Sequence, residues 1–178
     1  MEMEKVMTII TTYAELCRKA VLPLVLLDHF FAKQKLTPIA RIDHIGYKCA
    51  STDEFEALRR MLEAESAFMY QSVISQRRIA IIKLKRGFPT ALGVCAYLEL
   101  SDQKPDMSQE SGFDHAEIYP ITLTEDAFVA QLTQGGSALH KVVKPHHTTH
   151  NIDVGAKFVL KLCAEPLIAK IKREEMAL

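Results

Sequence analysis

Apolar residues near the start of the chain recur at helical spacings. Tyr13, Cys17 and Val21 are four residues apart, so they lie along one stripe of an amphipathic helix. Pro23 lacks a backbone N–H and is expected to break this segment, with a second short helix after it. We therefore predict an N-terminal helical extension over residues 1–37, which covers one face of a sheet.

The pattern then changes to short runs rich in β-branched and aromatic residues. A helix is expected to begin at Ser51 or Thr52, because each is a good N-cap and acidic residues follow in the first turn. One strand precedes this helix and three follow it, and we place them at Arg41–Cys49, Ala67–Ser75, Arg78–Lys85 and Val94–Leu100. The order βαβββ defines a first module over residues 38–104.

The same order begins again after a polar loop at residues 101–112. We predict a strand over Asp114–Ile121, a helix that starts at Thr124 and ends at Gly135-Gly136, and strands over Leu139–Lys144 and Lys157–Cys163. Residues 145–153 have no apolar rhythm and are expected to be a polar connection. A C-terminal helix from Pro166 completes a second module over residues 112–178.

Short matching segments support a duplication. Asp43-His44 and Asp114-His115 each open the first strand of a module, and residues 97–100 (YLEL) and 159–162 (VLKL) close the modules. Two copies with a long period fit a duplicated half-barrel better than a solenoid. We predict an α+β fold in which two βαβββ half-barrel modules form a cup, with extra N-terminal helices, a C-terminal helix and one compact domain overall.

Composition and charge exclude several classes of function. The 178 residues include 22 basic and 22 acidic side chains, and this balance argues against nucleic acid as a partner. The apolar run at residues 20–27 is far shorter than the roughly 20 residues of a membrane-spanning helix, and it does not resemble a secretory signal. We therefore expect no membrane partner. The four cysteines are widely spaced, which favours reduced thiols in a cytoplasmic protein.

The two histidines that open the modules are candidate metal ligands. Pairing of the modules would bring His44 and His115 to a shared cleft, and Glu99 interrupts an apolar strand, where a buried charge needs a partner. Two imidazoles and one carboxylate can hold a divalent metal such as Zn, Fe, Ni or Mn. Glu117 shares a face with His115 and competes with Glu99, and both glutamates are candidate catalytic residues.

A simpler interpretation of these residues stays open. The histidines would then be core residues hydrogen-bonded to the backbone, with Glu99 half-exposed at a strand edge. In either case the strand alternation directs Asp43 and Asp114 to the opposite face, where they would anchor the strands.

Basic and histidine side chains supply candidate substrate contacts. Lys83, Lys161 and Arg78 are positioned on predicted strands and can hold a carboxylate or phosphate, although a solvated face explains them as well. His147 belongs to a cluster with His146 and His150, which is either a solvated connection or a contact at the mouth of the cleft.

Together these motifs resemble the vicinal-oxygen-chelate superfamily of glyoxalases, extradiol dioxygenases and fosfomycin-resistance enzymes. The segments at residues 43–49, 77–84 and 112–118 are similar to its YecM-like branch, whose members are metal-binding bacterial proteins. The resemblance covers residues from about 40 to the end. It implies a metal held by the first and last strands of both modules, at His44, Glu99 and His115, with the fourth ligand position falling at Lys161.

Three functional hypotheses follow from the residues and the resemblance. The first is a divalent-metal enzyme that acts on a small oxygen-bearing molecule, by isomerase, lyase or dioxygenase chemistry. The second is a metal-free protein of the same fold that binds or sequesters a small ligand, for which Lys161 is the best evidence. The third is a structural partner protein that docks through its N-terminal helices. The sequence also leaves a homodimer open.

Overall fold

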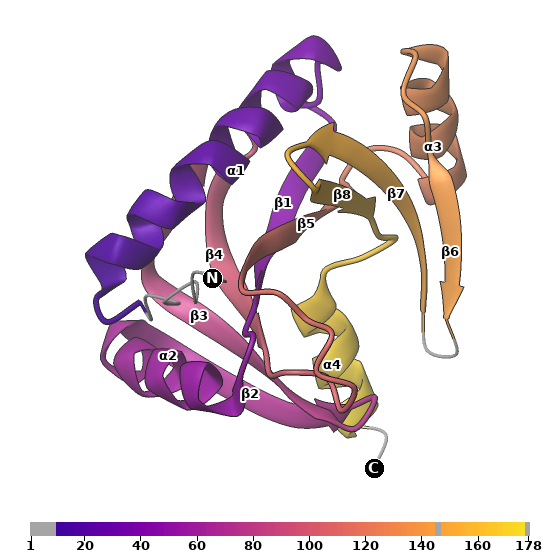
Figure 1. The fold of residues 1–178 in the computed structure, drawn as a ribbon. Helices are drawn as coiled ribbons and strands as arrows, with labels where there is room; N and C mark the ends of the chain where they lie inside the picture. Colours follow the sequence, from indigo (N-terminus) through magenta and orange to yellow (C-terminus); the bar gives the residue numbers. More distant parts are fainter. Residues whose placement is uncertain (1–9, 145–146, 177–178) are drawn as a thin grey trace, which may run out of the picture.

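The computed structural model describes residues 10–144 and 147–176, and the chain forms a strongly curved sheet within them (Figure 1). The first βαβββ unit contains β1 (Ala40–Lys48), α2 (Thr52–Glu65), β2 (Ser66–Ile74), β3 (Arg77–Thr90) and β4 (Gly93–Ser101). The second contains β5 (Gly112–Pro120), α3 (Glu125–Gln134), β6 (His140–Lys144), β7 (His147–Gly155) and β8 (Phe158–Leu162). The predicted α+β fold with a doubled βαβββ order is confirmed.

Strand pairing brings the first strands of the two units together at the centre of the sheet. Across the described residues, the eight strands are ordered β2-β3-β4-β1-β5-β8-β7-β6. β1 pairs antiparallel with β5, and each of them pairs in parallel with the last strand of its own unit, β4 or β8. The two Asp-His pairs therefore lie on adjacent central strands.

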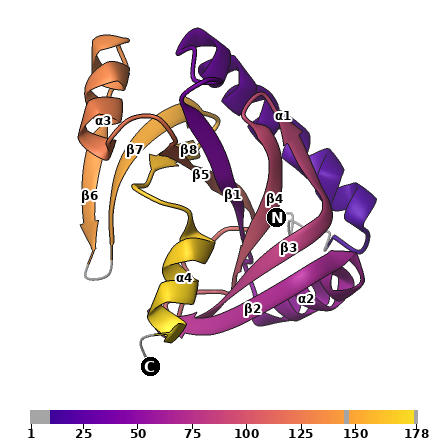
Figure 2. The same ribbon diagram turned by 180° about the vertical axis from the view of Figure 1, so that it is seen from behind.

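Helices cover the outside of the curved sheet. α1 (Tyr13–Lys33) packs against β3, β5 and β7, and α2 packs against β2, β3 and β4. Their buried faces join a core that includes Leu27, Phe55 and Leu98, all fully buried. By contrast, α4 (Leu167–Met176) lies between the β2–β3 and β6–β7 wings in two opposite views (Figures 1 and 2). It therefore stands at the open side of the sheet.

The predicted break at Pro23 is wrong, because α1 continues through that residue. Thr12 caps its start and forms a capping box with Glu15. Pro23 belongs to a buried stripe that continues to Leu27 and Phe31, while Val21, expected in the stripe, is 56% exposed. Burial of the whole stripe offsets the roughly 3 kcal/mol that an interior proline costs a helix. None of the helices in the described residues is both long and apolar enough to span a membrane.

The expected polar connection in the second unit is also wrong from residue 147 onward. Strand β7 occupies His147–Gly155 and pairs with both β6 and β8. The strand was not predicted because its side chains are mostly polar and its buried positions, Thr149 and Ile152, do not alternate. Thr149 donates a hydrogen bond to Asn151. The backbone pairing with two neighbours stabilises this strand without an alternating apolar pattern. Residues 145 and 146 lie outside the described residues.

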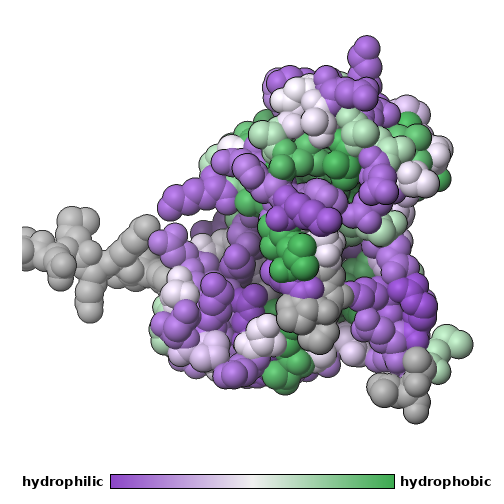
Figure 3. Space-filling view, turned by 90° about the vertical axis from the view of Figure 1, so that its right-hand side faces the viewer, coloured by the Kyte–Doolittle hydropathy of each residue, from purple (hydrophilic) through white to green (hydrophobic). Residues whose placement is uncertain are grey.

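The side of the molecule that carries α3 and β6 has a mixed surface. Hydrophilic residues cover most of this face, with separate hydrophobic groups between them (Figure 3). A face of this kind is ordinary for a protein in contact with water.

Candidate metal centre

A β-bulge places Asp43 beside His44. In the β1–β5 pairing, Ile42 is opposite Ile118 and His44 is opposite Glu117, so Asp43 is an extra residue on β1. The bulge changes the direction of the Asp43 side chain, whose Oδ2 lies 2.8 Å from Nδ1 of His44. Asp43 also accepts a hydrogen bond of 3.1 Å from the backbone N–H of Leu167, at the start of α4. The expectation that Asp43 faces away from His44 is therefore wrong.

A second bulge repeats this arrangement on the other central strand. Gly46 is opposite His115 and Tyr47 is opposite Phe113, so Asp114 is the extra residue on β5. Its Oδ1 lies 2.8 Å from Nδ1 of His115, and its other oxygen forms an ion pair with Lys48. Asp114, like Asp43, thus contacts its histidine instead of facing away.

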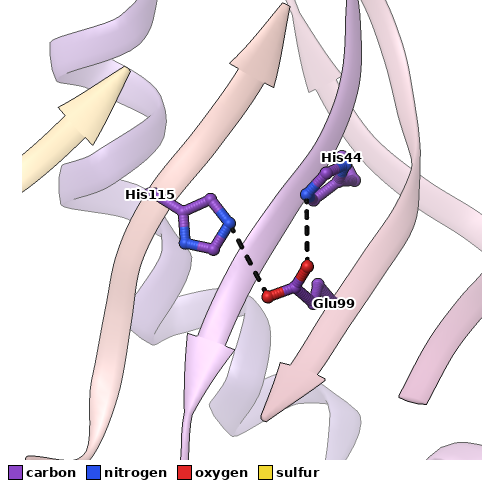
Figure 4. Close-up of side chains that lie close together, drawn as sticks. All are labelled: His44, Glu99 and His115. Atoms are coloured by element: carbon purple, nitrogen blue, oxygen red, sulfur yellow. Dashed lines mark ion pairs between the residues drawn. The ribbon is translucent and has the colours of Figure 1, made fainter. Parts of the chain in front are cut away.

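The two aspartates fix the orientation of both imidazole rings. A carboxylate at Nδ1 accepts a hydrogen bond from the ring N–H there, which leaves the lone pair on Nε2 available to a metal ion. The rings of His44 and His115 are 5.6 Å apart between centroids and nearly perpendicular. Figure 4 shows that both Nε2 atoms point toward the carboxylate of Glu99.

Glu99 lies between the two histidines. Its carboxylate oxygens are 3.7 Å from Nε2 of His44 and 3.8 Å from Nε2 of His115, and about 20% of its side chain is exposed. Glu99 is opposite Gly46 on β1, and Gly46 is in turn opposite His115 on β5. A Cβ at Gly46 would lie 2.1 Å from Cε1 of His115, so only glycine lets that ring lie across β1.

These three side chains fit a divalent metal ion. Among the described residues, Nε2 of His44 and Nε2 of His115 are buried and have no hydrogen-bond partner. Buried polar atoms without a partner are rare and costly, and here two of them face one carboxylate. Ligands about 2.1 Å from a tetrahedral ion are roughly 3.4 Å from one another, close to the two distances observed. The donor set is also one that Zn, Fe, Ni and Mn accept.

The charges around His44 favour a cation at this place. Burial alone would lower the pKa of His44, but the nearby carboxylates of Glu117, Asp43 and Glu99 outweigh it and raise the pKa to about 9. Burial likewise opposes ionisation of Glu99, whereas His115, His44 and Lys161 lower its pKa overall. A bound metal ion would interact with the same carboxylates.

Glu117 lies next to this group but is held by other partners. Its Oε1 is 3.9 Å from Nε2 of His44 and 3.6 Å from Nζ of Lys161, and its Oε2 accepts a 2.7 Å hydrogen bond from Sγ of Cys163. Burial would raise the pKa of Glu117, but His44, Lys161 and His115 lower it to about 2. Glu117 therefore presents a fixed, ionised carboxylate beside the two histidines.

The other predicted contacts fall in different places. Lys83 lies on the same face as Glu99, with its Nζ 5.9 Å from the centre of the Tyr97 ring. Arg78 lies apart from the candidate metal centre. It forms ion pairs with Glu56 and Asp102, and its guanidinium lies over the Phe55 ring of α2.

The predicted histidine cluster lies only in part within the described residues. His147 is the first residue of β7, while its neighbour His146 lies outside the described residues.

His150, the third member of the histidine cluster, also lies away from the two ligand histidines. It is on β7, and its Nδ1 is 3.4 Å from a carboxylate oxygen of Glu125 on α3. The structure therefore connects this histidine to a helix rather than to the centre.

Sequence reasoning missed four contributors to this site. The two aspartates were assigned to the wrong face because a bulge leaves no mark in an alternating pattern. Gly46 follows His44 by two residues, and a glycine inside a strand is the signal that could have shown a close approach. Cys163 gave no signal, because its role depends on the parallel pairing of β5 with β8.

Comparison with known families decides where this chain belongs. Residues 26–162 match the model of a family described as YecM protein. The chain belongs to the YecM family. The resemblance to the YecM-like branch is therefore confirmed, and the match covers both Asp-His pairs and Glu99. No curated protein matches the chain.

A solved structure shares this fold. A structural-genomics protein named EC4020 is 20% identical, covers 90% of each chain and has a TM-score of 0.67, which shows a shared fold. A putative dioxygenase from Bacillus subtilis is 13% identical over 71% of this chain and 41% of that one, with a TM-score of 0.44. A mutant of the fosfomycin resistance protein FosX from Listeria monocytogenes, in complex with Mn(II), is 11% identical over 72% and 95%, with a TM-score of 0.27. The last two scores are too low to support an argument about this YecM family member.

Proposed function

We propose that this chain is a divalent-metal-dependent enzyme that acts on a small oxygen-bearing molecule, by isomerase, lyase or dioxygenase chemistry. One observation carries the proposal: the buried Nε2 atoms of His44 and His115 have no partner among the described residues and face the same carboxylate of Glu99. An arrangement that leaves two buried imidazole nitrogens unpaired is explained if a cation joins them.

Each residue of the centre has a distinct task in this proposal. His44, Glu99 and His115 would hold the metal, and Asp43 and Asp114 would keep Nε2 of each ring directed at it. A metal bound there supplies Lewis acidity to oxygen atoms of the substrate. Glu117 does not bridge the histidines, and its carboxylate beside Nε2 of His44 is the second candidate catalytic group, which would contact the bound substrate.

Metal analysis of tag-free protein tests the proposal. The chain is depleted with a chelator, incubated in turn with Zn²⁺, Mn²⁺, Ni²⁺ and Fe²⁺, freed of unbound ions and analysed for metal. We expect one metal per chain in the native protein and less than a tenth of that in His44→Ala. The matched control is His29→Ala, an exposed histidine of α1, which keeps full metal content. Native protein that folds but retains no metal would remove the proposal.

A second candidate function has its own supporting observation. Lys161, on β8, is opposite Glu117 and forms an ion pair with it. The resemblance implies a fourth metal ligand at position 161, where this chain has a lysine. A lysine does not bind metal while protonated, and this favours a metal-free protein that binds a small ligand in the same cup. Ligand affinity that is unchanged in excess chelator, with no turnover, would support this function over the enzyme.

A further inference from the structure

Three basic residues lie on the same face of the sheet as the candidate metal centre. Lys161 is opposite Asn151 on β7, and Asn151 is opposite His140 on β6, so Lys144, four residues after His140, shares their face. On the other wing, Arg77 is four residues before Ile81, which is opposite Glu99. The register therefore directs Arg77, Lys144 and Lys161 to the concave side of the sheet.

The curvature of the sheet brings these cations together from different wings. β3 and β6 are far apart in strand order, yet the charges of Arg77 and Lys161 both act on Lys144. Burial lowers the pKa of Lys144, and repulsion from Lys161 and Arg77 lowers it further, more than Glu99 and Glu117 raise it. An anion between these groups would relieve the repulsion.

Glu117 pairs with Lys161, but the described carboxylates of the cup leave the other two cations without an ion pair. Among the described residues, neither Arg77 nor Lys144 has a carboxylate within ion-pair distance, and Arg77 donates only to the amide oxygen of Gln109. Asp114 is paired with Lys48, and the negative charge of Glu99 would be compensated by a bound divalent ion. The loaded cup would therefore carry a net positive charge next to the metal.

We infer that Arg77, Lys144 and Lys161 form an anion subsite beside the metal centre, which selects substrates that carry a carboxylate or phosphate group. The inference deepens the proposed function and rests on it. The difference between the two halves supports it, because β4 offers Glu99 while β8 offers Lys161 at the corresponding place. One half of the cup would thus hold the cation and the other half the negative group of the substrate.

Anion binding to the metal-loaded full chain tests the subsite. Inorganic phosphate and acetate serve as separate probes in calorimetric titrations at low ionic strength. We expect phosphate to bind and the variants Lys144→Gln and Arg77→Gln each to weaken it about 10-fold, as loss of one charge-assisted contact does. The matched control is Lys141→Gln on β6, whose exposed side chain is on the opposite face and which should change affinity less than about twofold. Binding of acetate with the same dependence on Lys144 would assign the subsite to carboxylates as well as phosphates.

Two results would overturn the subsite. One is the absence of binding of either probe to native protein. The other is an equal loss of affinity in Lys141→Gln and Lys144→Gln, which would show attraction to a diffuse surface charge. Metal content and thermal unfolding are measured on each sample. Metal uptake without anion binding rejects the subsite alone, whereas a chain that takes up no metal rejects the proposed function and with it a subsite beside the metal.

Discussion

The substitution Gly46→Ala tests how closely the two central strands must approach. A Cβ at position 46 would lie 2.1 Å from Cε1 and 2.4 Å from Nδ1 of His115. Since ordinary contact begins near 3.4 Å, the ring must retreat by about 1.3 Å. Metal ligands tolerate only about 0.2 Å of displacement, so His115 would cease to be a ligand.

The expected effects are a loss of stability and a loss of metal affinity. Overpacking of this kind costs about 1–3 kcal/mol of unfolding free energy. Displacement of one ligand should weaken metal binding by at least about 100-fold, since even loss of a residue that only orients a ligand costs about 10–100-fold. Urea unfolding of the metal-free protein and competition with a chromogenic chelator measure the two quantities separately.

A double-mutant cycle with His115→Ala isolates the steric cause. Without the imidazole ring, alanine at position 46 meets no clash there and should be neutral or stabilise the strand by up to about 1 kcal/mol relative to glycine. The coupling free energy should therefore be about 2 kcal/mol. An equal cost of Gly46→Ala in both backgrounds would show that the His115 ring is not the group that excludes a side chain at position 46.

Three further substitutions separate the site from the scaffold. Asp43→Asn keeps the shape of the side chain but removes the charge behind His44, so metal affinity measured by competition should fall about 10–100-fold; an unchanged affinity would contradict the orienting role. Arg78→Gln removes the partly buried pair with Asp102 and should lower the unfolding free energy by about 1–2 kcal/mol with full metal content, whereas loss of metal would place Arg78 in the site. Pro23→Ala restores a helical N–H and loses two buried carbons, so the net gain in thermal or urea stability should be about 1 kcal/mol; destabilisation would mean that the proline ring is essential to the core.

The sequence predicted the parts of the fold that repeat. The Asp-His pairs marked the starts of the two units, and β-type runs around α2 predicted all four strands of the first unit. Strand β7 was not predicted because its residues do not alternate between polar and apolar. Helix α1 was predicted as two helices because the sequence shows the cost of Pro23, whereas the burial of the stripe on both sides of it depends on the tertiary fold.

The candidate site was predictable in identity but not in geometry. His44, Glu99 and His115 could be selected because imidazoles and an interrupting carboxylate stood out in matching strands, and the structure brings all three together. The two bulges could not be predicted, since an extra residue is defined by the partner strand. The convergence of Lys144 with Arg77 likewise depends on curvature of the whole sheet, which local patterns do not contain.

We propose above that His44, Glu99 and His115 bind one divalent ion. The most direct measurement is an anomalous difference map from a crystal of metal-loaded, tag-free protein, collected on both sides of the absorption edge of the metal. We expect one strong peak about 2.1 Å from Nε2 of each histidine and from an oxygen of Glu99. Fully loaded protein whose only peak lies elsewhere, for example between Asp43 and Glu117, would contradict it.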